Sequence, residues 1–259
     1  MRIKTFLLIT TILLLGSIAY GNDQKQGPGI EPGAGKIFFY TAKKFGIPIL
    51  KATIKIENGY FEKGKPSYQI QAQVDSLQSM GFFFRMKNRF ASTVEAETCS
   101  PVRYVKEIDQ GGPLVRDKNY LQTITFDFSN KKVITEKGEK QEKQEIPLAP
   151  NTYDPLSMFA RYYLKEEIQP GQDIRMSIFD GVKLRQMVFH SKKEEVKSKR
   201  YGIVEAVCLE STTSFSTFGE QEGYIRIWYT MGVEKTPISI ELDLPIGDVK
   251  FELEEVKEL

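Results

Sequence analysis

Histidine and cysteine are scarce in this sequence of 259 residues, which has one histidine, His190, and two cysteines, Cys99 and Cys208. The usual zinc sites need three or four ligands, drawn mainly from these two residue types. The sequence therefore predicts no metal site. We also expect no cofactor, because the loop that comes nearest to a phosphate-binding motif, residues 59–66, has Pro66 where that motif needs serine or threonine.

Recognisable catalytic motifs are missing as well. The sequence has no Gly-x-Ser-x-Gly elbow, and its carboxylates are scattered through charged turns such as 136–145, with nothing to mark a glycosidase pair. His190 stands at a predicted strand end before the charged run 192–195, which is typical of a surface histidine rather than a general base. These absences favour a protein that is not an enzyme and indicate no catalytic residue.

Long apolar runs are also absent, apart from one near the N-terminus. Residues 6–15 are apolar but for two threonines, Arg2 and Lys4 precede them, and small residues occupy much of 16–21. This order is typical of a secretory signal peptide, so we expect residues 1–21 to be removed and the chain to reach the periplasm. The alternative is an uncleaved anchor, but the run falls short of the ~20 residues that span a bilayer. We expect no stable transmembrane anchor after cleavage.

An excess of one charge is the next missing feature. Without Arg2 and Lys4, the 36 basic residues fall to 34, which equals the 34 acidic residues. A neutral chain has no overall attraction for the phosphate backbone, and we therefore expect no nucleic-acid partner.

What the sequence does contain is a succession of short strands. Residues 22–35 are rich in glycine and proline and read as a linker, and residues 36–259 are expected to form a single β-rich domain. Alternation between apolar and polar residues, broken by turn residues, favours an antiparallel curved sheet or open β-barrel. The predicted strands are 36–41, 47–56, 68–74, 102–108, 120–128, 133–135, 174–179, 184–190, 203–209, 224–229, 238–244 and 249–253.

Two segments break the strand pattern and predict short helices. Asp154 and Pro155 supply an N-cap and a first helical residue, and apolar residues follow at helical spacing as far as Leu164. A second, weaker helix is expected over 77–86, which holds the apolar run 82–84.

The carboxyl-terminal third carries a resemblance to a known family. A strand with tryptophan (225–230), a strand that begins with proline (236–242) and a glycine turn into a last strand (246–253) resemble the end of the bacterial exported family of domain of unknown function 3108. Residues 45–53 and 153–157 resemble other parts of that family. The resemblance implies a β-rich fold and export to the cell envelope, and it implies no reaction and no catalytic residue.

Bulky apolar side chains gather on the two helical segments, and they lead to our functional hypotheses. One interpretation is that these residues line a cavity for a lipid or other amphiphile, and the other is that they fill an ordinary core. The residues in question are Phe82, Phe83, Phe84, Phe159, Tyr162 and Tyr163. We therefore expect a periplasmic protein that binds a hydrophobic or amphipathic envelope component. A protein–protein scaffold in envelope assembly is the alternative, with the same residues exposed as the partner contact, and an envelope hydrolase is the third hypothesis.

The two cysteines leave a choice open. Export to an oxidising compartment would allow a disulfide between Cys99 and Cys208. The alternative is two separate, inert thiols, because a bridge needs Cα atoms within about 7 Å.

Overall fold

The computed structural model describes residues 34–113, 117–138, 142–215, 221–243 and 247–259. The expected signal peptide and most of the expected linker lie outside these residues. The strands are β1 (Lys36–Lys44), β2 (Ile47–Glu62), β3 (Lys65–Ser76), β4 (Arg85–Glu95), β5 (Pro101–Gly111), β6 (Lys118–Asp127), β7 (Lys132–Lys137), β8 (Glu142–Pro147), β9 (Thr152–Tyr153), β10 (Asp173–Phe179), β11 (Leu184–Ser198), β12 (Gly202–Phe215), β13 (Gln221–Thr230), β14 (Pro237–Leu242) and β15 (Val249–Glu258). A 3₁₀ turn, η1 (Gln78–Met80), and one α-helix, α1 (Pro155–Leu164), complete the described elements.

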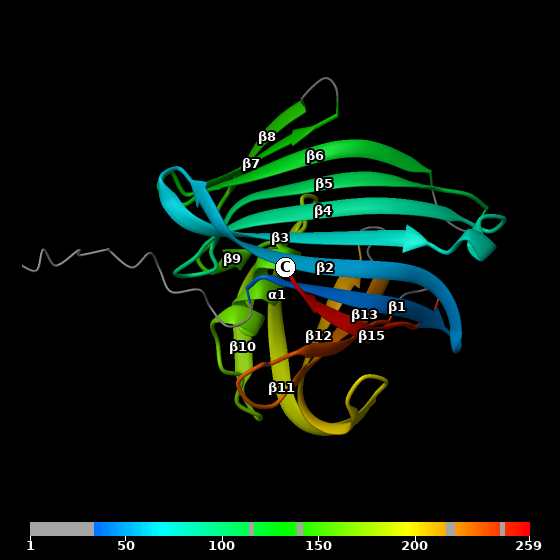
Figure 1. Ribbon diagram of the computed structural model, residues 1–259. Helices are drawn as coiled ribbons and strands as arrows, with labels where there is room; N and C mark the ends of the chain where they lie inside the picture. Colours follow the sequence, from blue (N-terminus) through cyan, green and yellow to red (C-terminus); the bar gives the residue numbers. More distant parts are fainter. Residues whose placement is uncertain (1–33, 114–116, 139–141, 216–220, 244–246) are drawn as a thin grey trace, which may run out of the picture.

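The fifteen strands form one large curved sheet (Figure 1). Its order is β8-β7-β6-β5-β4-β3-β2-β1-β15-β14-β13-β12-β11-β10-β9, so the first and last strands of the domain pair in the middle. Neighbours are antiparallel, except that β9 runs parallel to β10. The two outermost strands, β8 and β9, do not pair with each other, so the sheet stays unclosed. The expected antiparallel curved sheet is confirmed.

The period of two in the sequence sets which face of the sheet is buried. On β2, Leu50, Ala52, Ile54 and Ile56 are buried, and the intervening residues are half-buried or exposed. The same alternation holds on β1, β5 and β6. Because successive side chains point to opposite faces of a strand, one face builds the core and the other faces outward.

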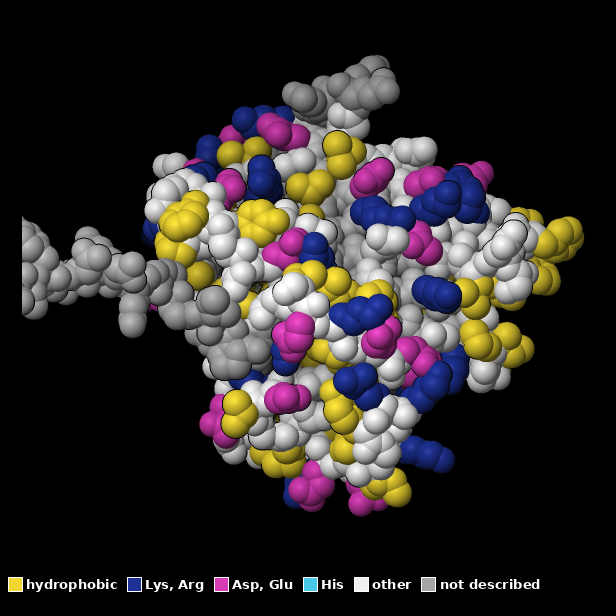
Figure 2. Space-filling model, in the orientation of Figure 1, with side chains coloured by type: hydrophobic (Ala, Val, Ile, Leu, Met, Phe, Trp, Pro, Cys, Tyr) yellow, Lys and Arg dark blue, Asp and Glu magenta, His cyan; other side chains and the backbone are white. Residues whose placement is uncertain are grey.

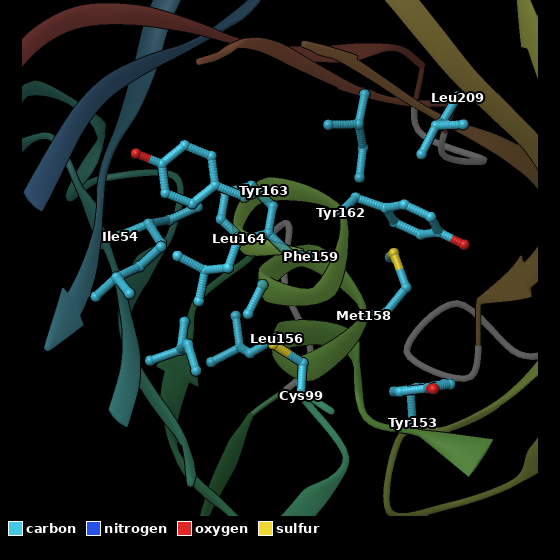
Figure 3. Close-up of a cluster of buried hydrophobic side chains, with 14 of the residues drawn as sticks. Ile54, Cys99, Tyr153, Leu156, Met158, Phe159, Tyr162, Tyr163, Leu164 and Leu209 are labelled. Atoms are coloured by element: carbon cyan, nitrogen blue, oxygen red, sulfur yellow. The ribbon is translucent and has the colours of Figure 1, made fainter. Parts of the chain in front are cut away.

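Helix α1 lies on the buried face and forms the centre of the core (Figure 3). Asp154 caps its N-terminus by accepting hydrogen bonds from the backbone N–H of Leu156 and Ser157 at 2.8 and 3.0 Å. The hydroxyl of Ser92 on β4 donates to the other carboxylate oxygen of Asp154 at 2.7 Å and ties the helix to the sheet. The predicted helix is confirmed, with its predicted cap and its proline at the first position.

Aromatic rings join α1 to both halves of the sheet. The ring of Tyr163 meets that of Phe38 on β1 edge-on at 5.3 Å, and the ring of Phe159 lies 6.1 Å from that of Tyr229 on β13. Figure 3 shows α1 side chains directed to opposite sides, toward Ile54 on one side and Leu209 on the other. The helix therefore fills the interior of the curved sheet on this side of the molecule.

A second connection crosses the interior through the turn between β10 and β11. Lys106 on β5 donates a hydrogen bond to the carbonyl oxygen of Asp180 at 2.6 Å, and Gln122 on β6 donates to that of Gly181 at 2.7 Å. Gly181 has φ +88°, and a Cβ atom there would lie 2.7 Å from Ile124, so this turn packs tightly against β6. The two arms of the unclosed sheet are thus held together from inside.

Two expectations need correction. The segment 77–86 is not a helix, because only η1 forms and β4 already begins at Arg85; Leu77 at the N-cap position makes no side-chain cap hydrogen bond. Just before β1, Ala34 is buried, and the backbone of Gly35 donates a hydrogen bond to Ile56 and accepts one from Leu259.

The second correction concerns His190. It lies inside β11, which continues to Ser198, and not at a strand end. The charged run that follows it continues the same strand and pairs with β12. The side chain of His190 is exposed, as expected, and its Nδ1 atom lies 2.7 Å from a carboxylate oxygen of Asp173.

Candidate functional site

An open groove of about 380 Å³ crosses the outward face of strands β1 to β6. We call it the outer groove. Two adjacent rows of cross-strand neighbours form it, and the first row runs Phe39, Thr53, Gln73, Arg89, Glu107 and Leu121 from β1 to β6. The second row runs Ile37, Lys55, Gln71, Ala91 and Val105 from β1 to β5. Ala72 and Phe90 also line the groove. Figure 2 shows apolar and charged side chains interspersed over these strands.

The groove is apolar at both ends. Ile37 and Phe39 supply the β1 end, and Val105 and Leu121 supply the β5–β6 end. Leu121 is 54% exposed, which is high for a leucine on a central strand. Ala91 lies between the two ends. Its side chain is short, and a larger side chain at this position would fill part of the groove.

Polar side chains occupy the middle of the groove, and neighbours hold them in place. The ammonium group of Lys55 lies 2.7 Å from Glu57, and the guanidinium group of Arg89 lies 2.9 Å from Asp75. Gln71 donates to the same Glu57 at 3.1 Å. These contacts fix two cations and an amide on the groove floor, although both cations remain about one third exposed. The middle of the groove is therefore polar, with the carboxylate of Glu107 beside Arg89, and its two ends are apolar.

Comparison with known proteins identifies the family. Residues 37–254 match the family described as "Protein of unknown function (DUF3108)". This chain belongs to the DUF3108 family. The match includes α1, strands β2 to β14, and all of β1 and β15 except their outermost residues, so nearly the whole described fold belongs to the family's domain.

A solved structure shares the fold of this DUF3108 protein. It is a β-barrel-like protein of domain of unknown function DUF1849 from Brucella abortus, with a TM-score of 0.55 and 10% sequence identity. The likeness covers 86% of this chain and 97% of that one. At this identity it supports the β-barrel-like architecture alone. No curated protein matches the chain.

Three of the six predicted contact residues lie on α1 of the DUF3108 fold. Phe159, Tyr162 and Tyr163 are each at most 3% exposed, and they pack in the core around the helix. The burial of the two tyrosines raises the pKa of each hydroxyl above its ordinary value. Their position corresponds to the alternative in which these residues fill a core.

The other three predicted residues lie at one end of the sheet, beyond η1. Phe82 is 84% exposed and Phe83 is 46% exposed, whereas Phe84 packs inward against Ala42 and Leu50. The structure does not bring this group together with the α1 aromatics. Phe82 and Phe83 therefore lie at the surface and not in the core.

The two cysteines are both fully buried, and no disulfide bond joins them. Burial raises the pKa of the Cys208 thiol to about 12, and nearby Glu194 adds to this effect. Since the thiolate is the reactive form, this shift disfavours reaction of Cys208 at neutral pH.

Sequence reasoning missed both the outer groove and Lys106. The groove residues are spread over six strands, and only the register of those strands brings them into two rows. Burial lowers the pKa of Lys106 to about 8, and the negative charge of Asp180 opposes this shift. A buried lysine on the core face of a predicted strand is the one signal that could have singled it out.

Two features are absent from the described part of the DUF3108 domain. Within the described residues, no group of three or more His, Cys, Asp and Glu side chains is placed to hold a metal ion. In the same part of the chain, no helix has the length and apolar character that would let it cross a membrane.

Proposed function

We propose that this DUF3108 protein is an exported, periplasmic, non-enzymatic protein that binds an amphipathic component of the cell envelope in its outer groove. The observation that carries the proposal is the groove itself, whose two apolar ends flank a polar middle. Its volume lies within the range of about 300–1,000 Å³ that is usual for small-molecule sites.

The distribution of side chains argues for an amphiphile rather than a purely apolar ligand. A hydrocarbon chain would contact Ile37 and Phe39, or Val105 and Leu121, without loss of a hydrogen bond. A polar or anionic head group would meet Lys55 and Arg89, whose donors interact favourably with oxygen ligands. A wholly apolar ligand would instead bury these partly exposed cations, at a cost in desolvation.

Binding can be tested directly with a matched pair of variants. Leu121→Asp places a carboxylate in the apolar end of the groove, and Ile203→Asp makes the same kind of change at another exposed aliphatic residue, on β12. Both positions are more than half exposed, so neither change should disturb the fold. We expect Leu121→Asp to weaken the binding of a fluorescent lysophospholipid by about tenfold, because the loss of one buried aliphatic contact is of that size. Ile203→Asp should bind like the parent chain.

Native mass spectrometry of the chain purified from a periplasmic fraction, followed by organic extraction, would identify a natural occupant. A released amphiphile whose occupancy falls in Leu121→Asp supports the proposal. Equal occupancy in the two variants would place the ligand elsewhere, and a chain that carries no amphiphile and binds none of the probe would overturn the proposal.

The periplasmic location rests on the pattern of residues 1–21 and has its own test. Expression of the full chain followed by cell fractionation should recover it in the periplasmic fraction. Its first residue should be Tyr20 or Asn22, because cleavage is expected after Ala19 or Gly21. Recovery in the cytoplasm with Met1 intact would contradict this part of the proposal.

A further inference from the structure

Large apolar side chains stand exposed on two turns at one end of the sheet. Phe45 and Ile47, at the β1–β2 turn, are 86% and 59% exposed, and Phe82 and Phe83, between η1 and β4, are 84% and 46% exposed. We call these four residues the apolar rim. Figure 1 shows both turns at the same end of the molecule. The backbone N–H of Leu77 donates to the carbonyl oxygen of Ile49 at 3.0 Å, which links the two segments.

The fold does not need an aromatic residue at Phe45. Phe45 and Gly46 both have positive φ, at 51° and 78°, so they form the tight hairpin turn that prefers asparagine followed by glycine. A bulky residue is uncommon in this left-handed conformation. The β2–β3 turn has the same geometry with Lys63 and Gly64, so the turn itself is compatible with a polar side chain. Phe45 thus combines an unfavoured conformation with nearly complete exposure, which points to a role outside the fold.

Rigid structure supports the other half of the rim. The backbone N–H groups of Phe83 and Phe84 donate to the carbonyl oxygen of Met80 at 2.8 and 3.0 Å. Phe84 anchors the segment in the small apolar cluster around Leu50, and the rings of Phe82 and Phe83 meet edge-on at 5.4 Å. The two exposed rings are therefore held in place and project outward.

Positive charge surrounds the rim residues in the sequence. Residues 43–51 contain three lysines and no acid, and residues 77–87 contain Arg85 and Lys87 and no acid. Lys43 pairs with Glu252 and Arg85 pairs with Asp109, whereas Lys51 and Lys87 are exposed. Acids oppose part of this charge. Asp75 is the cross-strand neighbour of both Lys51 and Lys87 and pairs with Arg89, and Asp243 and Asp248 lie on the connection before β15.

The opposite end of the same strands provides a comparison. It also exposes aromatic rings, Phe61 at 71% and Phe128 at 45%. There, however, an acid precedes or follows each ring, namely Glu62 after Phe61 and Asp127 before Phe128. Of these two ends, only the rim end has exposed aromatic rings whose neighbours in the sequence include cations and no acid.

We propose that the apolar rim docks onto an anionic lipid surface, with its four side chains inserted between head groups and the adjacent lysines facing the negative charge. Aromatic and aliphatic side chains next to lysine and arginine are the combination that binds such a surface. A protein partner fits less well, because stable protein interfaces need a broad complementary patch. The rim instead consists of separate projecting side chains, which lipid accepts without a matching pocket. This inference is independent of the outer groove.

Co-flotation of the full chain with vesicles tests the inference. The chain should bind vesicles of phosphatidylcholine with about one third phosphatidylglycerol more tightly than vesicles of phosphatidylcholine alone, and added salt should weaken the binding. The double variant Phe45→Asn/Phe82→Ser should bind the anionic vesicles at least tenfold more weakly. Asn suits the turn better than Phe, so this loss cannot come from a damaged hairpin.

Matched variants distinguish the contribution of the apolar rim to vesicle binding from effects that a change elsewhere on the surface would also have. Phe61→Ser/Phe128→Ser removes two exposed rings from the opposite end and should leave vesicle binding unchanged. Lys51→Glu/Lys87→Glu should abolish the preference for phosphatidylglycerol. Leu121→Asp, in the outer groove, should bind vesicles normally, so a failure of the groove proposal would not be mistaken for a failure of this one.

Several results would overturn the inference. Equal vesicle binding by the parent chain and by Phe45→Asn/Phe82→Ser rejects lipid docking. Lack of binding to either kind of vesicle rejects it as well. If the rim variant instead loses a co-purifying protein, or a dimer seen by sedimentation, while vesicle binding is absent, the occupant is a protein partner or a second copy.

Discussion

The aromatic side chains of α1 and those of the apolar rim have similar chemistry and opposite environments. Phe159 and Tyr163 are at most 3% exposed in the centre of the core, whereas Phe45 and Phe82 are at least 84% exposed at one end of the sheet. Aromatic residues are thus shielded from water in one place and exposed to it in the other, so composition alone does not decide their role. The local backbone structure of each segment decides whether its rings are buried.

The difference begins with how each segment starts. Asp154 and Ser157 form a reciprocal capping box before α1, and Pro155 occupies the first helical position, so this segment becomes a helix that the sheet can surround. The segment after β3 lacks a side-chain cap at Leu77, and its 3₁₀ turn ends at Met80. The rings that follow are therefore left on a short turn at the sheet's end.

The largest effect that we predict is at the centre of the core. Phe159→Ala should lower the free energy of unfolding by about 3–5 kcal/mol, because it removes a fully buried ring and leaves a cavity. Urea denaturation followed by Trp228 fluorescence would measure it. Phe82→Ala is the matched control at the rim and should change the free energy by less than about 0.5 kcal/mol. Similar losses in the two variants would remove the distinction between core and rim.

The helix cap should give the next largest effect. Asp154→Ala removes the acceptor for two backbone N–H groups and for the hydroxyl of Ser92. The lost cap and the unsatisfied buried donor together should cost about 2–4 kcal/mol of the free energy of unfolding. Asp154→Asn keeps one acceptor oxygen and should lose less than half as much. Equal losses in the same urea measurement would show that the carboxylate acts by its charge and not as a cap.

The sequence was sufficient to predict most of the fold, because its strands and α1 depend on local signals. The alternation on β2 identified the buried face, and Asp154 with Pro155 located the helix start. Strand β4 was missed, since the apolar run 82–84 just before it was assigned to a helix. The ends of β11 and β12 were missed too, because polar residues on an outward face give no apolar pattern.

The candidate sites were less accessible to prediction, for a different physical reason. The outer groove depends on register across six strands, and no local pattern reports that Phe39 and Leu121 belong to the same row. The rim residues Phe82 and Phe83 were recognised as unusual, but the sequence could not tell whether they are exposed. Phe45 was not singled out, and the signal that could have done so is an aromatic residue before glycine in a predicted hairpin turn.

Lys106, whose hydrogen bond to the β10–β11 turn joins the two arms of the sheet, should make the free energy of unfolding depend on pH. Lys106 has a pKa lowered to about 8 by burial, and in the unfolded chain it regains its ordinary value of 10.5. Between pH 8 and 10 the unfolded state therefore binds more protons, and the free energy of unfolding rises with pH, by roughly 2 kcal/mol. Above pH 10, buried tyrosines such as Tyr40, whose pKa burial raises, act in the opposite direction.

Urea denaturation at pH 8 and pH 10 would measure this effect in the parent chain and in Lys106→Met. The variant removes the titrating group, so the rise should disappear, while contributions from all other groups cancel in the comparison. An equal rise in both chains would assign the pH dependence to other residues. It would also mean that water reaches the interior near Asp180 more readily than the core around α1.

The smallest predicted effect has the opposite sign to those in the core. Phe45→Asn should raise the free energy of unfolding by about 0.5–1 kcal/mol, because asparagine adopts positive φ more readily and the exposed ring contributes little packing. Lys63→Asn is the matched control, in the other hairpin with the same turn geometry. It should raise the free energy of unfolding by less, because it removes no exposed ring. A loss of stability in Phe45→Asn would show that the ring packs on its own hairpin. A gain would mean that the fold is more stable without this ring, as expected for a residue retained for contact with something outside the chain.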